Sequence, residues 1–313
     1  MSIDLAPLRS ARRLLIEAEL EPVQGKRFQP TGFPDLGPAT FQAGDTACLL
    51  LESAQSMANR LEETIWDKSN NTVVDDLAGI SFVVVNDESG QFLTSSIVES
   101  HRLNSPYILE SKDKTFHQQL REDCSVMEKG PIDRKALAKT LLKYDINALI
   151  HGVFLAKQEF AGGRLRVARA LSSFIEAEQV QVAASGGVKN DHVDPQGDTK
   201  KGFGNVPFHR EEFTAEKITA YFNVDLQQIR SYGLGDDVEN LLTLLSLYKI
   251  RALLDGDLRL RTACDLQPKQ EDVVATRPKG FVLPNLDSIT KSLKDAIEKC
   301  KSEMTVNSVV YKK

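Results

Sequence analysis

Basic side chains are the residues of this chain with the clearest potential chemistry. They gather locally in three groups: Arg12, Arg13, Lys26 and Arg27; Arg164, Arg166 and Arg169; and Arg259 with Arg261. A guanidinium group pairs with phosphate oxygens through a fork of N–H donors, so such groups can follow a nucleic-acid backbone. Each group alone is also compatible with an ordinary solvated surface. Because the chain carries a net charge of −5, local gathering matters more than the whole-chain sum.

A second candidate contact is the turn-rich and locally basic segment from Ser185 to Pro207. A loop this long inside a compact domain is usually functional or disordered. Its last part approaches the aromatic strand motif of RRM domains, whose rings stack on bases. However, Asn205 stands where an aromatic ring is expected, and Pro207 does not suit a central strand. We therefore interpret the segment as a loop that offers three contacts to a nucleic acid: Lys200, Lys201 and Phe203.

The sequence lacks the motifs of the common enzyme classes. It contains no GxxxxGK[ST], GxSxG or HExxH pattern, and these patterns carry phosphate-binding, esterase and metalloprotease chemistry. Its four cysteines form no CxxC pair, and its five histidines show no HxxxH spacing. Glu99, His101 and Arg102 could assemble a general acid/base site, although a lone histidine near a helix end is more often structural. We predict no catalytic residue, no metal and no cofactor.

Strands and helices alternate among the elements that must position these groups. Apolar alternation predicts strands over residues 12–21, 80–85, 148–156, 216–226 and 258–266. Helical spacing and caps predict helices from Ser53 to about Trp66, from Asp133 to about Tyr144, over 164–176, from Asp236 or Asp237 to Gly256, and over 286–303. Residues 22–45 are too rich in glycine and proline for a regular element.

Two β-α-β units follow from this order, one over residues 12–85 and one over residues 216–266. Two such units predict an α+β fold with a ferredoxin-like (RRM-like) sheet and helices on one face. The region between them would be one large insertion. On the last strand, the open face of the sheet would present Arg259 and Arg261 to a ribose-phosphate backbone.

Several longer segments carry a resemblance to a known family. They occur in this order: 27–37 (RFQPTGFPDLG), 52–62 (ESAQSMANRLE), 94–96 (TSS) with 101–103 (HRL), 149–154 (LIHGVF), 185–190 (SGGVKN) and 202–208 (GFGNVPF). Over nearly the whole chain they resemble the Csb-one family of CRISPR-associated RAMP proteins. That family is the Cas-seven-type backbone subunit of type I-G (formerly I-U) Cascade.

The resemblance implies a modified RRM palm with inserted fingers and a thumb-like hairpin, in one domain over residues 1–313. The first half of the palm would cover about 12–85 and the second half about 213–268. The insertion would cover about 86–210, with 185–208 as the thumb candidate, and a C-terminal helix about 286–303. Copies would stack head-to-tail along one CRISPR RNA and display its spacer for pairing with target DNA, so that base pairing reads sequence while the protein reads shape.

The resemblance also implies partners and contact residues. The partners would be CRISPR RNA, the target DNA strand through the guide, further copies of the chain and other Cascade subunits, in the cytoplasm and without a membrane. Matched motifs and side-chain chemistry together give the RNA-binding candidates: Arg27, Gln55, Ser56, Asn59, Arg60, His101, Arg102, Arg164, Arg166, Arg169, Lys189, Asn190, Lys200, Lys201, Phe203, Arg259 and Arg261.

Two alternatives to a non-catalytic RNA scaffold stay open at this point. One is a RAMP-type endoribonuclease that processes CRISPR RNA through His101 or His151. The other is a protein–protein scaffold without any RNA contact. Binding to RNA phosphates should weaken as salt rises because binding releases counterions, whereas assembly without RNA should be insensitive to ribonuclease.

Overall fold

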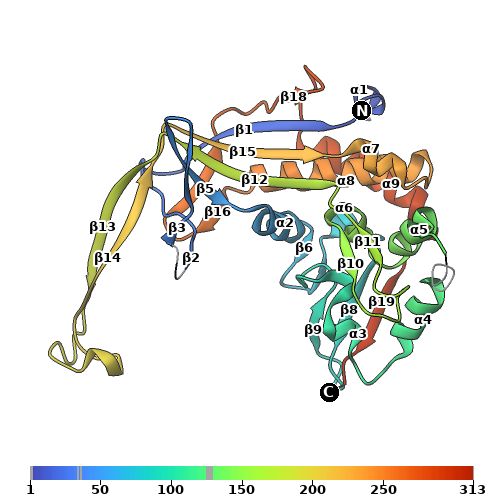
Figure 1. The fold of residues 1–313 in the computed structure, drawn as a ribbon, viewed down its shortest axis with the longest axis horizontal. Helices are drawn as coiled ribbons and strands as arrows, with labels where there is room; N and C mark the ends of the chain where they lie inside the picture. The colour runs from blue at the N-terminus through green and yellow to red at the C-terminus, as the bar shows by residue number, and fades with distance from the viewer. Residues whose placement is uncertain (1–2, 34, 36, 125–129, 313) are drawn as a thin grey trace.

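A curved antiparallel sheet forms the centre of the computed structural model, which describes residues 3–33, 35, 37–124 and 130–312 (Figure 1). Its strands lie in the order β16-β17-β1-β15-β12-β5-β4, and β18 pairs with β1. The strands run over β16 (Leu258–Arg261), β17 (Cys264–Pro268), β1 (Leu14–Pro22), β15 (Lys217–Val224), β12 (Leu171–Glu178), β5 (Thr46–Glu52), β4 (Thr40–Ala43) and β18 (Ala275–Arg277). Pro34 and Leu36, which belong to one segment of the family resemblance, lie outside the described residues.

The four strands β17, β1, β15 and β12 have the neighbour order of a ferredoxin-like fold. Strand β1 pairs antiparallel with β15 and with β17, and β12 pairs antiparallel with β15. β1 therefore runs parallel to β12, and β15 runs parallel to β17, as in two interleaved β-α-β units. The predicted α+β class with an RRM-like sheet is confirmed.

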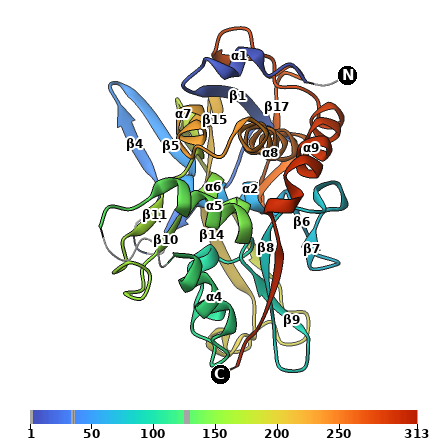
Figure 2. The same cartoon turned by 90° about the vertical axis from the view of Figure 1, so that its right-hand side faces the viewer.

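Helices cover one face of this sheet. The helix α2 (Ala54–Glu63) packs on β12, and α8 (Asp236–Asp255) packs on β16 and β17. The last helix, α9 (Leu286–Cys300), lies beside α8 (Figure 2). Helix α2 begins where predicted, because the Ser53 hydroxyl accepts a hydrogen bond from the Ser56 amide at 3.3 Å. The predicted α8 begins one residue after Gly235, which is its N-cap without a side-chain hydrogen bond.

A second lobe is built around a smaller three-stranded sheet, in the order β19-β8-β9. Its strands are β8 (Phe82–Asn86), β9 (Phe92–Ser95) and β19 (Val306–Val310), with α3 (Pro106–Leu109), α4 (Thr115–Cys124), α5 (Arg134–Tyr144) and α6 (Ile146–His151) around them. The prediction that residues 80–85 share a sheet with residues 12–21 is wrong. Residues 82–86 pair in parallel with the C-terminal strand β19 instead.

Three other segments differ from their predicted type. Residues 164–176 are not a helix, because they hold β11 (Leu165–Val167) and the first part of β12, which pairs with β15 along its whole length. Residues 148–156 hold the end of α6 and the short β10 (Val153–Leu155), separated by Gly152. Residues 258–266 are a hairpin of β16 and β17, because the chain turns at Ala263 with a φ of 57°.

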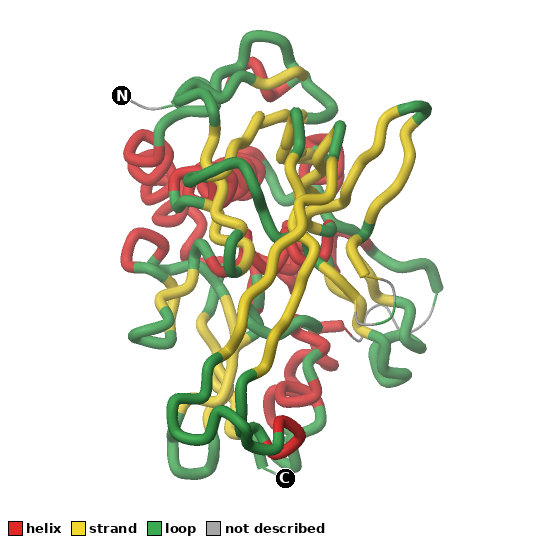
Figure 3. Tube along the Cα trace, turned by 90° about the vertical axis from the view of Figure 1, so that its left-hand side faces the viewer, coloured by secondary structure: helices red, strands yellow, loops and turns green. Residues whose placement is uncertain are grey.

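A long two-stranded hairpin extends away from both lobes (Figures 1 and 3). Its strands are β13 (Gln181–Lys189) and β14 (Val206–Thr214), which pair over nine residue pairs. The predicted loop is therefore irregular only at its tip, where residues 190–205 contain a short 3-10 helix, Thr199–Lys201. Pro207 is accommodated because a two-stranded ribbon has a free edge on each strand.

The remaining elements are short. They are α1 (Ala6–Arg9), β2 (Gly32–Phe33), β3 (Gly37–Pro38), β6 (Trp66–Asp67), β7 (Thr72–Val73), α7 (Leu226–Ser231) and the 3-10 turns Asp75–Leu77, Arg102–Asn104 and Lys301–Glu303. The region 22–45, predicted to be irregular, therefore contains β4, which pairs with β5. Within the described part of the chain, every helix is too short or too polar to cross a bilayer.

Candidate nucleic-acid interface

The open face of the central sheet is acidic. On β1, the buried residues alternate with outward residues that include Glu17 and Glu19. Across the register, Glu19 is opposite Thr219, which is opposite Glu176 on β12. Phe174 stacks on Tyr221 on this face, with ring centroids 4.9 Å apart. Among the described residues, Glu19 is paired with Lys269 at 2.5 Å, whereas Glu17 and Glu176 have no ion pair. Carboxylates repel phosphates, so this face is a poor surface for a nucleic-acid backbone.

A cleft beside the sheet has the opposite charge. Its volume is about 1270 Å³, and it lies where α5, α6, β10, β11 and α7 meet the 3-10 turn at Arg102. Arginine and histidine side chains line it: His101, Arg102, Arg134, His151, Arg164, Arg166 and Arg169. No aspartate or glutamate is among the described residues that line it. We refer to it as the arginine cleft.

The β10–β11 hairpin forms one wall of the arginine cleft. Arg166 is paired across this hairpin with Phe154, and both side chains are exposed. The connection before β10 requires Gly152, with φ 80° and ψ 159°, a conformation reached almost only by glycine. A Cβ there would lie 2.7 Å from the carbonyl oxygen of Val167. The close approach of these two segments sets the position of the wall.

Arg134 also lines the cleft, from the first position of α5. The Asp133 carboxylate caps this helix by accepting hydrogen bonds from the Lys135 and Ala136 amides at 2.9 and 3.0 Å. A cation at a helix N-terminus opposes the helix dipole, so the helix gains no stability from Arg134. Its side chain is exposed and makes no hydrogen bond or ion pair within the described residues.

Hydrogen bonds fix the floor of the cleft. The Tyr232 hydroxyl donates a hydrogen bond to the carbonyl oxygen of Leu149 at 2.7 Å. The side-chain amide of Gln228 donates to that hydroxyl at 2.8 Å and to the Ala168 carbonyl oxygen at 2.6 Å. Burial raises the pKa of Tyr232 to about 12, so the hydroxyl remains a donor at neutral pH. These bonds tie α7 to α6 and to the segment that carries Arg169.

Arg169 and the start of α2 meet at the rim. The Arg169 guanidinium donates to the carbonyl of Ala54 at 3.0 Å and to the side-chain oxygen of Gln55. Gln55 in turn donates to the side-chain oxygen of Asn59 at 3.1 Å. Three predicted contact residues, Arg169, Gln55 and Asn59, thus form one connected polar group, while the Ser56 amide serves the helix cap.

Arg102 is not the exposed contact that the sequence suggested. Only 6% of the residue is exposed, and its Nε and Nη2 donate to the two carboxylate oxygens of Glu62 at 2.7 and 2.8 Å. Its φ of 50° is unusual for a residue with a side chain. The bidentate pair joins α2 to the second lobe, so Arg102 is a structural cation beneath the cleft, while His101 beside it is exposed.

A second buried basic side chain lies below the cleft. Lys249 of α8 is fully buried, and its Nζ contacts the side-chain oxygen of Asn147 and lies 3.0 Å from Nε2 of His151. Burial lowers the pKa of Lys249 to about 7 and holds the pKa of His151 well below its ordinary value. His151 is 2% exposed, so it lies in the floor and is not an accessible acid or base.

Arg60 and Arg261 also have structural roles. Both bind the buried carboxylate of Glu52, which is 2% exposed. Arg60 further donates to the carbonyls of Arg259 and Leu260 at 3.1 and 2.6 Å. These bonds join α2 and β5 to the β16–β17 hairpin. We expected Arg261 on an open sheet face and Arg60 on an RNA-facing helix surface. Both expectations are wrong, because both guanidinium groups are paired with the buried Glu52 carboxylate.

The remaining basic candidates are exposed but lie away from the cleft. Arg259 is exposed on β16 and lies 3.8 Å from the Asp265 carboxylate. Arg27 lies 3.6 Å from the buried carboxylate of Glu212 at the base of the long hairpin, where Arg210 also binds it at 2.7 Å. These two side chains are not brought together with the arginine cleft.

The long hairpin carries the other predicted contacts at its end. Its exposed side chains there are Lys189, Asn190, Lys200, Lys201 and Phe203. The Asp191 carboxylate shapes the tip by accepting from the Val193, Asp194 and Gly204 amides at 2.9, 3.0 and 2.8 Å. Phe203 is 52% exposed, so an apolar ring and two lysines project from a tip that is held by its own hydrogen bonds.

Arg134 was not predicted as a contact residue. The sequence also did not predict that Arg12 and Arg13 line one cavity together with Arg277. A signal for Arg134 was present in the sequence, since a cation directly after an N-cap aspartate is unfavourable for the helix. The other arginines come from distant positions in the chain, and only the pairing of β18 with β1 brings them together.

Comparison with known proteins gives one family match and two distant structural matches. The model of the family "CRISPR-associated protein GSU0053 (Cas_GSU0053)" matches residues 14–182. No curated protein matches the chain.

Two solved structures share a distant likeness of fold. One comes from a "CRISPR RNA-guided surveillance complex, pre-nicking", with 14% identity and a TM-score of 0.43, covering 82% of this chain and 76% of that chain. The other is Csc2 of Thermofilum pendens, with 9% identity and a TM-score of 0.34, covering 96% of this chain and 82% of that chain.

Proposed function

The chain belongs to the family of CRISPR-associated protein GSU0053, and we propose that it is a non-catalytic backbone subunit of a Cascade complex that binds CRISPR RNA. The arginine cleft is the observation that carries the proposal. In a chain with a net charge of −5, five arginines line one cleft without a carboxylate among its described lining residues. Such a site favours a flexible polyanion, since its donors are spread along a cleft of about 1270 Å³.

The cleft's side chains divide into a support and a contact layer. Arg102 is held by Glu62, and His151 by Lys249. His101, Arg134 and Arg166 are exposed above them. We infer that these exposed groups contact phosphates and riboses of the guide, while the tip of the long hairpin, with Phe203, acts as the thumb that presses between bases. The resemblance to type I-G backbone subunits motivates the assignment of this subtype.

The non-catalytic part of the proposal rests on the histidines. An endoribonuclease without metal needs an accessible acid and base close together. His151 is buried, and the ammonium of Lys249 lies beside its Nε2, which leaves His101 as the exposed histidine of the cleft. We therefore expect His101→Ala to weaken RNA binding without changing the length of the bound RNA. Accumulation of uncleaved precursor RNA in that variant would instead support an endoribonuclease.

The test is purification of the chain from cells that carry a matching CRISPR array, followed by extraction of bound nucleic acid. We expect an intact RNA of spacer-plus-repeat length that is protected from ribonuclease. The variant Arg134→Ala/Arg166→Ala should lose most of this RNA, whereas Arg259→Ala, an exposed arginine outside the cleft, should retain it. Recovery of RNA-free wild-type protein from these cells would contradict the proposal and favour a protein–protein scaffold.

A further inference from the structure

A second hollow adjoins the arginine cleft on the far side of Arg134. Its volume is about 570 Å³, and it shares Arg134, Gln228 and Ser231 with the cleft. Its other lining residues are Arg12, Arg13, Asp225, Gln227 and Arg277. The two cavities are therefore neighbours with a common wall, and Arg134 faces both of them. We refer to the second cavity as the adjoining hollow.

The charges of the adjoining hollow are not internally balanced. Asp225 is the one carboxylate among its described lining residues. One of its oxygens accepts a hydrogen bond from the backbone N–H of Gln228 at 2.9 Å, and the other lies 3.0 Å from the Arg13 guanidinium. This carboxylate is fully used by the helix cap and by Arg13. No positive charge beyond that of Arg13 is neutralised by it.

Three guanidinium groups remain available. The side chains of Arg12, Arg134 and Arg277 are exposed and make no hydrogen bond or ion pair within the described part of the chain. They come from the segment before β1, the first turn of α5 and the end of β18. Like charges gathered at one cavity repel one another, so their convergence opposes folding slightly, and an anion bound between them would remove this repulsion.

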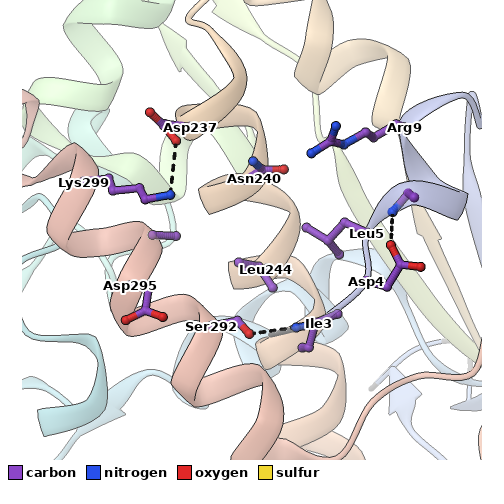
Figure 4. Close-up of a pocket in the computed structure, with 12 residues that line it drawn as sticks. Ile3, Asp4, Leu5, Arg9, Asp237, Asn240, Leu244, Ser292, Asp295 and Lys299 are labelled. Atoms are coloured by element: carbon purple, nitrogen blue, oxygen red, sulfur yellow. Dashed lines mark hydrogen bonds and ion pairs between the residues drawn. The ribbon is translucent and has the colours of Figure 1, made fainter. Parts of the chain in front are cut away.

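Another hollow of the molecule provides a contrast. The cavity between α1, α8 and α9 also contains an arginine, Arg9, but its walls carry Asp4, Asp237 and Asp295 as well (Figure 4). Lys299 lies 3.8 Å from Asp237 there. Its three aspartates outnumber its two cations, Arg9 and Lys299, so that cavity does not favour an anion.

We propose that the adjoining hollow is a second phosphate-binding site, and that the RNA strand held in the arginine cleft continues past Arg134 into it. This inference rests on the proposed function, since it extends the same strand. The ligand is the phosphodiester backbone of single-stranded RNA, and recognition is through guanidinium–phosphate pairs. The site lengthens the stretch of RNA that one copy holds.

The experiment measures binding of end-labelled uridine oligomers of increasing length to the full chain, by fluorescence anisotropy over a range of salt concentrations. The test variant is Arg12→Ala/Arg277→Ala, and the matched control is Arg9→Ala. We expect the test variant to bind short oligomers like the wild type and long oligomers more weakly. For long oligomers, the slope of log affinity against log salt should shrink by about 0.7 for each phosphate that the variant no longer binds.

Several outcomes would overturn the inference. One is a test variant that binds every length like the wild type, and another is an equal loss at every length. A length-dependent loss with deoxythymidine oligomers alone would overturn the assignment to RNA. If Arg134→Ala/Arg166→Ala also binds RNA normally, the proposed function fails with it, whereas normal binding by the Arg12→Ala/Arg277→Ala variant alone leaves the proposed function intact. Urea midpoints confirm that each variant is folded.

Discussion

At the scale of single residues, arginines in this chain serve two purposes that burial distinguishes. Arg60, Arg102 and Arg261 are paired with the buried carboxylates of Glu52 and Glu62. A buried carboxylate without a partner is costly, so these arginines are committed to the fold. The exposed Arg134 and Arg166 of the cleft bind no buried carboxylate within the described residues, so a phosphate can bind them.

The Glu62–Arg102 pair gives a direct test of this division. Replacing Arg102 with Met leaves the Glu62 carboxylate, 3% exposed, without its bidentate partner. We expect Arg102→Met to lower the free energy of unfolding by about 3–5 kcal/mol, measured by urea denaturation at pH 7. The double variant Glu62→Met/Arg102→Met should recover most of this loss. A stable Arg102→Met protein with weakened RNA binding would mean that Arg102 contacts RNA directly.

The buried Lys249 predicts a dependence of stability on pH. Burial lowers its pKa from 10.5 to about 7. Between these values the unfolded chain binds a proton that the folded chain has released, so the stability contributed by this group rises with pH. Below pH 7 both states are protonated and the contribution is constant. Asp145 in the same cluster, with its pKa raised by burial to about 7, is ionised in both states above pH 8.

The measurement compares the wild type with Lys249→Met by urea denaturation at several pH values. From about pH 8 to pH 10, the free energy of unfolding of the wild type relative to the variant should rise by about 1.4 kcal/mol per pH unit. Lys291→Met, which replaces an exposed lysine of α9, should show no such trend. A flat difference for Lys249→Met would mean that Lys249 keeps its proton in the folded protein.

At the scale of elements, helices were predicted better than strands, for a physical reason. The side chains of Asp133 and Ser53 accept hydrogen bonds from backbone amides two or three residues later. The start of each helix is therefore determined by neighbouring residues and can be predicted from the sequence. β12 was predicted as part of a helix because a short apolar segment fits both periods. From Leu171 to Ala177, buried and partly exposed residues alternate as in a strand, and this strand forms through pairing with the distant β15. The arginine cleft could not be predicted, since it joins segments from both lobes.

The junction between α6 and β10 offers a test of how the cleft wall is held. At Gly152 the φ is 80°, and an added Cβ would lie 2.7 Å from the Val167 carbonyl oxygen. Gly162 has a similar φ of 70°, but its nearest neighbour would be at 4.0 Å. We expect Gly162→Ala to cost about 1–2 kcal/mol and Gly152→Ala about 3 kcal/mol or more. Equal urea midpoints for the two variants would contradict a close packing of the wall.

At the scale of the whole molecule, charge is separated between faces. The open face of the central sheet carries Glu17, Glu19 and Glu176, while arginines gather in the arginine cleft and the adjoining hollow. This arrangement makes a net charge of −5 compatible with the proposed RNA binding. On that proposal, RNA would be directed to one side of the molecule, because the RRM-like face would repel it. The net charge alone would have argued against the function that the cleft supports.

The long hairpin extends from the body and exposes apolar side chains that a single copy leaves in water (Figure 1). These side chains are Val182, Val188, Phe203, Val206 and Phe208, each at least 36% exposed. Exposed apolar groups gathered on one element mark an interaction surface. If copies assemble along the guide, the hairpin is the element that reaches farthest toward a neighbour. We therefore expect the number of copies bound per RNA to rise in steps as the RNA lengthens.

Mass photometry of the chain with RNAs of graded length measures this directly. A variant whose residues 190–205 are replaced by Asn-Gly, a favourable two-residue hairpin turn, loses Phe203 and the reach of the tip but keeps the other four apolar residues. We expect one copy to bind through the arginine cleft, more weakly than in the wild type because the thumb is lost, and the stepwise growth to stop. Its urea midpoint should stay near that of the wild type, because β13 and β14 pair with each other and the Asp191–Gly204 hydrogen bond lies within the replaced segment. Unchanged stepwise growth in this variant would show that copies associate through another surface, and loss of binding by the first copy would place the hairpin in the primary RNA contact.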